Sequence, residues 1–166
     1  SDWAESKWPI FRGSLIGFFT GIIPGGGAVV ASLTSYAVEK RFSKHPEEFG
    51  KGSLAGVAGP ESANNGASSS SFIPLLTLGI PCNAAVAMIF AALLIQGVTP
   101  GPFMIVERPD VFWGVIASMY VGNVILLILN LPLVGLWVQL LKVPFGILGP
   151  IIAMFTTVGC YSLAND

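Results

Sequence analysis

Apolar residues occur along this chain in long tracts, and short polar stretches separate the tracts. The first tract, Ile10–Val38, contains one charged residue, Arg12, and is interrupted by the run Pro24-Gly-Gly-Gly27. Proline lacks an amide donor and consecutive glycines disfavour a helix, so a helix should end there. Each flanking segment has roughly 11 to 14 residues, or about 16–21 Å of helix, which is less than the apolar thickness of a bilayer. Residues 10–38 therefore predict either a broken spanning helix or a re-entrant hairpin.

The second feature is a polar stretch, and we predict a loop over residues 39–59. Four basic residues make it the best candidate for the cytoplasmic side, because cytoplasmic loops carry an excess of Lys and Arg: Lys40, Arg41, Lys44 and Lys51. Basic residues on both flanks of the first tract favour the re-entrant hairpin, although the broken spanning helix stays open. His45 lies beside Pro46 in this charged stretch and is predicted to be a surface residue rather than a ligand.

A second pair of apolar segments follows, and it is interrupted in the same way. The run Ile80-Pro-Cys-Asn83 separates them, and Pro100-Gly-Pro102 closes the unit. We predict a second broken hairpin over residues 60–102. The remainder of the chain, residues 111–163, predicts spanning helices, since its first part has about 21 residues without a charge, enough to cross a bilayer.

The composition is typical of an integral membrane protein. Hydrophobic residues make up 53% of the chain and charged residues 10%, whereas about a quarter of the residues in soluble domains are charged. The mean hydropathy is +0.75. We predict an all-α, polytopic integral membrane protein. A formal net charge of -1 argues against nucleic acid as a partner, because there is no basic face to neutralise phosphates. Cys82 and Cys160 lie in apolar tracts and are interpreted as small packed hydrophobes rather than a disulfide.

The two interruptions predict where the chemistry is. Non-helical backbone at membrane depth is tolerated only against protein or a water-filled cavity, and transporters place substrate sites at such interrupted helices. The backbone amides of Gly25, Gly26 and Gly27 would be open to a carboxylate. The alternative is a kink or close helix packing, for which small residues are also common.

A polar cluster precedes the second pair of segments. Ser62, Asn64 and Asn65 carry donors and acceptors that need partners in a membrane, and we predict that they contact substrate; a helix cap is the alternative. Glu61 lies either at the interface or deeper, where a charge costs about 2.5–3.5 kcal/mol and would require a cation or a basic partner. Thr77 and Asn83 flank the second interruption and are weaker candidates for the same cation or substrate.

Catalysis has little support in the sequence. The chain has one histidine, in the polar stretch, and no serine lies in a Gly-x-Ser-x-Gly setting. The apolar tracts contain no pair of carboxylates for acid–base chemistry. We therefore predict no enzyme activity and no cofactor; a membrane-embedded enzyme stays the minor alternative, and a channel or scaffold subunit without its own substrate site is a further one.

At the two interruptions the sequence resembles the large membrane subunit of the bacterial tripartite tricarboxylate transporters. The resemblance covers nearly the whole chain, 1–166, and its order and spacing agree. It rests on these stretches: Gly21-Ile-Ile-Pro-Gly-Gly-Gly-Ala28, Tyr36-Ala-Val-Glu-Lys-Arg-Phe-Ser-Lys44, Phe49-Gly-Lys-Gly52, Pro60-Glu-Ser-Ala-Asn-Asn-Gly66, Pro74-Leu-Leu-Thr-Leu-Gly-Ile-Pro81, Gly97-Val-Thr-Pro-Gly-Pro102 and Asn130-Leu-Pro-Leu-Val-Gly-Leu-Trp137.

The resemblance implies a multi-pass subunit of the bacterial inner membrane built from two related halves, of which this chain is similar to the second. It implies a small membrane subunit and a periplasmic solute-binding protein as partners, a citrate-like di- or tricarboxylate as substrate, and a coupling Na+ or H+. The Pro-Gly-rich and Asn-Asn motifs are those associated with the substrate region. One departure is Cys82, where the family pattern has glycine; a side chain there would narrow the approach to the second interruption.

Overall fold

A computed structural model describes residues 2–140 and 142–164 of the chain, and every element that these residues form is a helix. The expected all-α class is confirmed. The chain divides into two units, Ser1–Ala117 and Ser118–Asp166. The first unit contains both interruptions, and it is the part that positions the candidate site.

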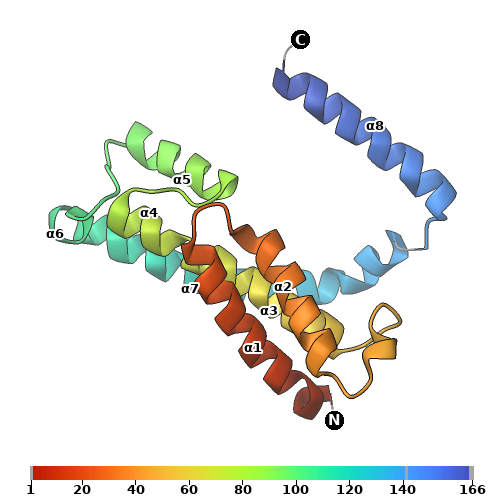
Figure 1. Ribbon diagram of the computed structural model, residues 1–166. Coiled ribbons are helices and arrows are strands. Elements are labelled where there is room, and N and C mark those ends of the chain that lie inside the picture. The colour runs from red at the N-terminus through yellow and green to blue at the C-terminus, as the bar shows by residue number, and fades with distance from the viewer. Residues whose placement is uncertain (1, 141, 165–166) are drawn as a thin grey trace. The chain divides into compact units, whose positions relative to one another are not determined.

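The first interruption separates α1 (Asp2–Ile22) from α2 (Gly27–Phe42). The chain folds back there, so that α2 returns alongside α1 as a helical hairpin (Figure 1). Gly25 and Gly27 adopt the left-handed region, with φ values of 82° and 62°. Side chains with a Cβ rarely adopt that region, which explains why the turn is built from glycine.

Small residues bring the third helix, α3 (Ala55–Ser70), against α1. Glycines spaced four apart on α1 lie against small residues spaced four apart on α3 in the same order, so the two helices run parallel: Gly13 lies at Gly59, Gly17 at Ala63 and Gly21 at Ala67. A Cβ placed on Gly17 would lie 2.2 Å from the carbonyl oxygen of Ala63. This backbone approach is the small-xxx-small packing that membrane helices use in place of a hydrophobic driving force.

Replacement of Gly17 by alanine should lower the stability of the full-length subunit. Alanine is the better helix former, but its methyl group would push α1 away from α3, and overpacking of this kind costs about 1–3 kcal/mol. The measurement is thermal unfolding of the purified protein in detergent. Gly114→Ala is the matched control, because nothing lies within 4 Å of a Cβ at that position. Equal melting temperatures for the two variants would contradict the packing.

α3 also packs against α2. The loop between these two helices is shorter than the sequence predicts. α2 continues to Phe42 and α3 begins at Ala55, so residues 43–54 connect the helices where the sequence predicted a loop over 39–59. Glu39, which has 2% of its surface exposed, faces inward from the last turns of α2. Its carboxylate accepts hydrogen bonds from Arg12 of α1, from Nε to Oε1 at 2.8 Å and from Nη2 to Oε2 at 2.5 Å. The paired charge lets the helix continue.

The second interruption lies between two short helices. α4 (Phe72–Leu78) continues directly from α3, and Gly79, at φ 70°, ends it. An extended segment then leads to α5 (Ala84–Ile95), where the Asn83 side chain accepts a hydrogen bond from the Val86 amide at 3.0 Å and caps the helix. The connection to the last helices includes α6 (Met104–Glu107). A small apolar core joins these elements: Leu76, Val98, Met104 and Phe112.

The last helices are α7 (Pro109–Leu140) and α8 (Phe145–Ala164). Among the described residues α7 is the one helix long and apolar enough to cross a membrane, over the 31 residues Pro109–Gln139. None of its apolar window is buried within the chain, whereas the core helix of a soluble protein is mostly covered. Length and composition therefore agree with a spanning segment over the first part of the expected range 111–163, beginning two residues earlier.

Candidate functional site

The two interruptions meet in the folded chain. The amide of Gly25, in the first interruption, donates a hydrogen bond to the carbonyl of Cys82, in the second, at 3.1 Å. The Cys82 thiol lies 3.5 Å from the carbonyl of Ile22, the last residue of α1, and donates toward it. Cys82 is buried, with 4% of its surface exposed. The turn of the hairpin therefore lies on the extended segment between α4 and α5, and the two stretches of irregular backbone form one site.

Of the three glycine amides predicted to be open to a carboxylate, that of Gly25 bonds the Cys82 carbonyl and that of Gly26 bonds the Ile23 carbonyl at 3.0 Å, which leaves the amide of Gly27. A Cβ on Gly25 or Gly27 would have no neighbour within 4 Å, while one on Gly26 would lie 2.3 Å from the carbonyl of Thr20. Among the described residues no side chain caps the start of α2. The first amides of a helix have no partner within it, and they carry the positive end of the helix dipole. An anion can approach this backbone without meeting a side chain.

Asn64 lies beside the start of α2. The Ser32 hydroxyl of α2 donates to the carbonyl of Pro60 in α3 at 3.2 Å, and the two helices run in opposite directions (Figure 1). Asn64 lies one turn after Pro60 in α3, and Ala28 lies one turn before Ser32 in α2. Because the helices run in opposite directions, Asn64 and Ala28 lie at the same level. Asn64 is half-buried, and its amide has no hydrogen bond to a described residue. Of the predicted polar residues, it is the one placed next to the glycine run with free donors.

The other predicted polar side chains are engaged locally. Three of them donate to the carbonyl four residues earlier in their own helix, at 2.7, 2.9 and 2.7 Å respectively: Ser62, Asn65 and Thr77. These bonds use a donor and leave the oxygen lone pairs available. Asn83 caps α5, yet it directly follows Cys82 and so lies next to the point where the interruptions meet.

A polar strip covers the outer side of α3. Glu61 and Asn65 are exposed, one turn apart, and Ser68 and Ser69 continue the strip. No described residue forms an ion pair with the Glu61 carboxylate. The opposite side of α3 carries the small residues that pack on α1 and α2. Asn64 and Asn65 are neighbours in sequence, but they consequently face different surroundings: Asn64 lies toward the start of α2 and Asn65 on the exposed strip.

Two contributors were not predicted from the sequence. The sequence places Glu39 in the polar stretch and so does not predict its pairing with Arg12. The signal for the pair is that Arg12, the single charge in the first tract, needs an opposite charge nearby. The sequence predicts Cys82 to be a small packed hydrophobe, and it is buried, whereas Cys160 is exposed. The contact of Cys82 with the first interruption is long-range and has no local signal.

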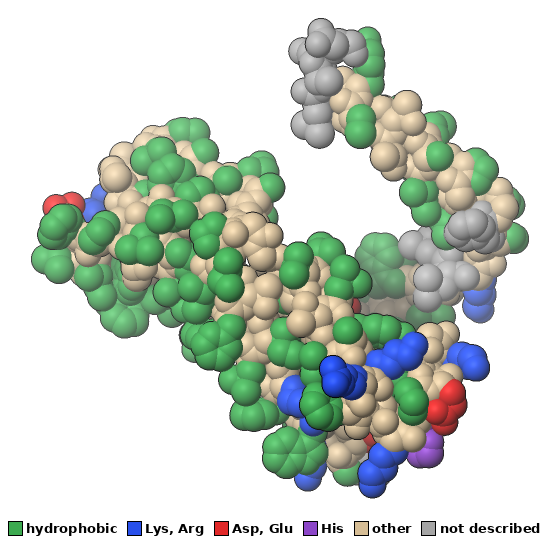
Figure 2. Space-filling view, viewed as in Figure 1, with side chains coloured by type: hydrophobic (Ala, Val, Ile, Leu, Met, Phe, Trp, Pro, Cys, Tyr) green, Lys and Arg blue, Asp and Glu red, His purple; other side chains and the backbone are tan. Residues whose placement is uncertain are grey.

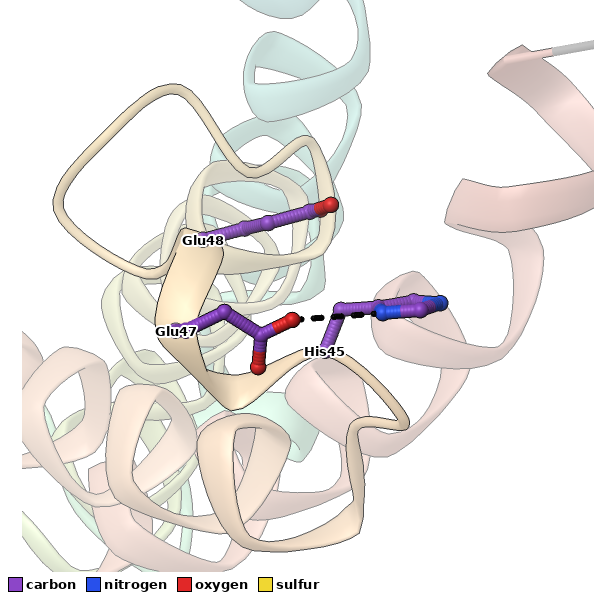
Figure 3. Close-up of side chains that lie close together, drawn as sticks. All are labelled: His45, Glu47 and Glu48. Atoms are coloured by element: carbon purple, nitrogen blue, oxygen red, sulfur yellow. Dashed lines mark hydrogen bonds and ion pairs between the residues drawn. The ribbon is translucent and has the colours of Figure 1, made fainter.

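Three titratable side chains at the other end of the hairpin form a separate cluster (Figure 3). Residues 46–48 form the short helix η1 (Pro46–Glu48), and His45 Nδ1 lies 3.3 Å from Glu47 Oε1. The ligand atoms of His45, Glu47 and Glu48 lie within 4.8 Å of one another. The His45 and Glu47 side chains are 66% and 65% exposed, so they are well solvated, and the prediction of His45 as a surface residue is confirmed.

Comparison with known proteins identifies the family of this sequence. A family model described as "Tripartite tricarboxylate transporter TctA family" matches residues 1–166. The chain is similar to two proteins of Agrobacterium vitis. It is 55% identical over 165 residues to "Uncharacterized 52.8 kDa protein in TAR-I ttuC' 3'region", covering 99% of this chain and 33% of that protein. It is 57% identical over 150 residues to "Uncharacterized protein in TAR-II ttuC' 3'region", covering 90% and 62%. The chain thus spans less than two thirds of either relative. No solved structure matches it.

Proposed function

Because the chain belongs to the tripartite tricarboxylate transporter TctA family, we propose that it forms part of the membrane subunit of a carboxylate importer. The substrate is a citrate-like di- or tricarboxylate, which a periplasmic solute-binding protein delivers, and a small membrane subunit completes the complex. The subunit is a multi-pass protein of the bacterial inner membrane, and a gradient of Na+ or H+ drives uptake. The family is one of transporter components, which argues against an enzyme.

The observation that carries the proposal is the contact between the two interruptions. Irregular backbone within a bilayer must be buried in protein or line a polar cavity. Here the Gly25 amide is satisfied by the Cys82 carbonyl, so each interruption partly shields the other. The remaining amides at the start of α2 are open to a ligand. Interrupted helices that meet in this way form the substrate and ion sites of secondary transporters.

The carboxylate is held by neutral donors. The Gly25 and Gly26 amides are bonded within the chain, so the amide of Gly27, where a Cβ would meet nothing within 4 Å, is the backbone donor of this run that is left for a carboxylate, and the Asn64 amide lies beside it as a side-chain donor. The one cation of the first tract, Arg12, is already bound by Glu39. Hydrogen bonds and the dipole of α2 therefore carry the binding of the anion, with a hydrogen bond to a charged group contributing about 1.5–3 kcal/mol.

The coupling cation uses oxygen ligands. Glu61 and Asn65 offer a carboxylate and an amide oxygen on the outer strip of α3, and Thr77 and Asn83 flank the second interruption. A carboxylate at membrane depth costs several kcal/mol unless a cation or proton compensates it. Na+ would bind the neighbouring oxygens of Glu61 and Asn65 directly, while H+ would neutralise Glu61, and both explain why an acidic residue stands in this strip.

The test is uptake of labelled citrate by the intact complex in proteoliposomes. A Na+ or pH gradient should drive accumulation against the citrate gradient, and dissipation of that gradient with an ionophore should stop it. Tartrate and succinate in excess show which acids compete. Equilibration of citrate without accumulation, unaffected by the ionophore, would indicate a channel and contradict the proposal.

A further inference from the structure

A cavity lies at the end of the hairpin away from the interruptions. Its volume is about 500 Å³, and it is bounded by the first turns of α1, the end of α2, the connecting segment and the start of α3. Its polar and aromatic lining includes Glu5, Trp8, Arg12, Phe42, Lys44 and Glu48. Figure 2 shows that Lys, Arg, Asp, Glu and His side chains gather at this end, while hydrophobic side chains cover much of the rest of the hairpin. The proposed transport site uses none of these residues.

The lining carries charges of both signs. Glu39 engages Nε and one hydrogen of Nη2 of Arg12, and the other guanidinium hydrogens remain as donors on a side chain that is 38% exposed. Lys44 adds a second cation, and Glu5 and Glu48 add two carboxylates. A ligand of one sign would leave half of this lining facing a like charge. A zwitterion with separate phosphate and ammonium groups would pair with both halves.

The surroundings of the cavity have the character of a membrane interface. Trp8 is 59% exposed and Phe42 70% exposed at the cavity. The Trp8 ring packs edge-on against Phe11, with centroids 6.3 Å apart, and Leu15 continues this exposed apolar side of α1 away from the charged end. Aromatic rings at a charged end, followed by apolar surface, mark the level of lipid headgroups.

We propose that this cavity binds the headgroup of phosphatidylethanolamine. The phosphodiester accepts hydrogen bonds from Arg12 and Lys44, and the ammonium lies against Glu5 and Glu48. An acyl chain follows Phe11 and Leu15 along α1. The site is separate from the carboxylate site and does not depend on it. Its occupation would fix the open end of the hairpin, where α1 and α2 are joined by the Arg12–Glu39 pair, at the depth of the headgroups.

The experiment is lipid binding to the full-length subunit, measured by native mass spectrometry after delipidation in detergent. Phosphatidylethanolamine and phosphatidylglycerol of equal chain length are added in turn. We expect the ethanolamine lipid to bind at least tenfold more tightly. Lys44→Ala should weaken both lipids, whereas Glu48→Gln should weaken the ethanolamine lipid alone. Lys51→Ala and Glu107→Gln are the matched controls, because these exposed residues carry the same charges outside the lining.

Three results would overturn the proposal. Equal binding of the two lipids would remove the zwitterion. Binding that the lining variants and their controls change alike would place the lipid elsewhere. Displacement of the ethanolamine lipid by millimolar citrate would show a site for small carboxylates instead. Arg12 is left intact in these variants, because its loss would disturb Glu39, so a change in lipid binding is not confused with unfolding.

Discussion

Asn64→Leu should reduce the initial rate of citrate uptake at low citrate by roughly 10- to 150-fold, the loss expected when one hydrogen bond to a charged group of about 1.5–3 kcal/mol is removed. Leucine keeps the size of asparagine and removes its amide, and the half-buried Asn64 has no described partner whose loss would unfold the helix. The measurement is uptake into proteoliposomes by the intact complex, as a function of citrate concentration.

Asn130→Leu is the matched control for that experiment. Asn130 also lies in a helix, and its amide donates to the carbonyl four residues earlier at 2.9 Å, so the same substitution there removes a local bond only. We expect transport by this variant to stay near that of the unmodified protein. If Asn64→Leu also transported citrate at the unmodified rate, the carboxylate would not be bound at the start of α2.

Arg12→Met should destabilise the subunit by about 3 kcal/mol, the lower end of the range for breaking a buried ion pair. Removal of the guanidinium leaves Glu39 unpaired with 2% of its surface exposed, and a buried carboxylate without a partner is costly. The lower end applies because Arg12 is itself partly exposed, which lets water reach the carboxylate once the cation is gone. Chemical unfolding of the purified protein in detergent measures the loss.

The double variant Arg12→Met/Glu39→Leu separates the pair from its burial. Replacing both partners with apolar residues of similar volume is often neutral, so the double variant should recover most of the stability that Arg12→Met loses. Arg108→Met removes the exposed pair with Asp110, whose side chains are 46% and 67% exposed, and should leave stability unchanged within error. A double variant as unstable as Arg12→Met would show that the loss does not come from the unpaired Glu39 carboxylate.

The interruptions themselves could be predicted from local chemistry. Pro24 and the three glycines that follow it cannot continue a helix, and the structure ends α1 at Ile22 and begins α2 at Gly27. Gly79 and the run to Asn83 end α4 in the same way. What local chemistry does not contain is the contact between Gly25 and Cys82, because it depends on how helices far apart in sequence pack. The meeting of the two interruptions is a property of the fold.

The end of the first hairpin shows why charge alone misleads. The sequence predicts that a loop starts at Glu39, Lys40 and Arg41. These residues lie in α2 instead, where Glu39 pairs with Arg12 of the neighbouring helix. Residue type alone does not identify the helix cap either. Ser62, Asn64 and Asn65 lie inside α3 and cap no helix, whereas Asn83 caps α5 from the position immediately before it.

The spacing of small residues was a further signal. Gly13, Gly17 and Gly21 recur every four residues, the spacing that places them on one side of a helix. That spacing predicts a close helix partner but does not identify it. The partner is α3, where Gly59 also makes room for the Glu39 side chain: a Cβ at Gly59 would lie 2.7 Å from Glu39 Cγ. Packing and ion pairing therefore depend on the same glycine.

The central claim is that the glycine turn lies within the membrane region and faces the substrate. Thiol labelling by a membrane-impermeant maleimide tests it most directly, in complexes that carry Ala28→Cys or Lys51→Cys and have the exposed Cys160 replaced by alanine. We expect Ala28→Cys to react more slowly than Lys51→Cys in the segment that connects α2 to α3, and citrate to slow the reaction of Ala28→Cys further without affecting Lys51→Cys. Equally fast labelling of both positions, unchanged by citrate, would place the turn in bulk water and contradict the account.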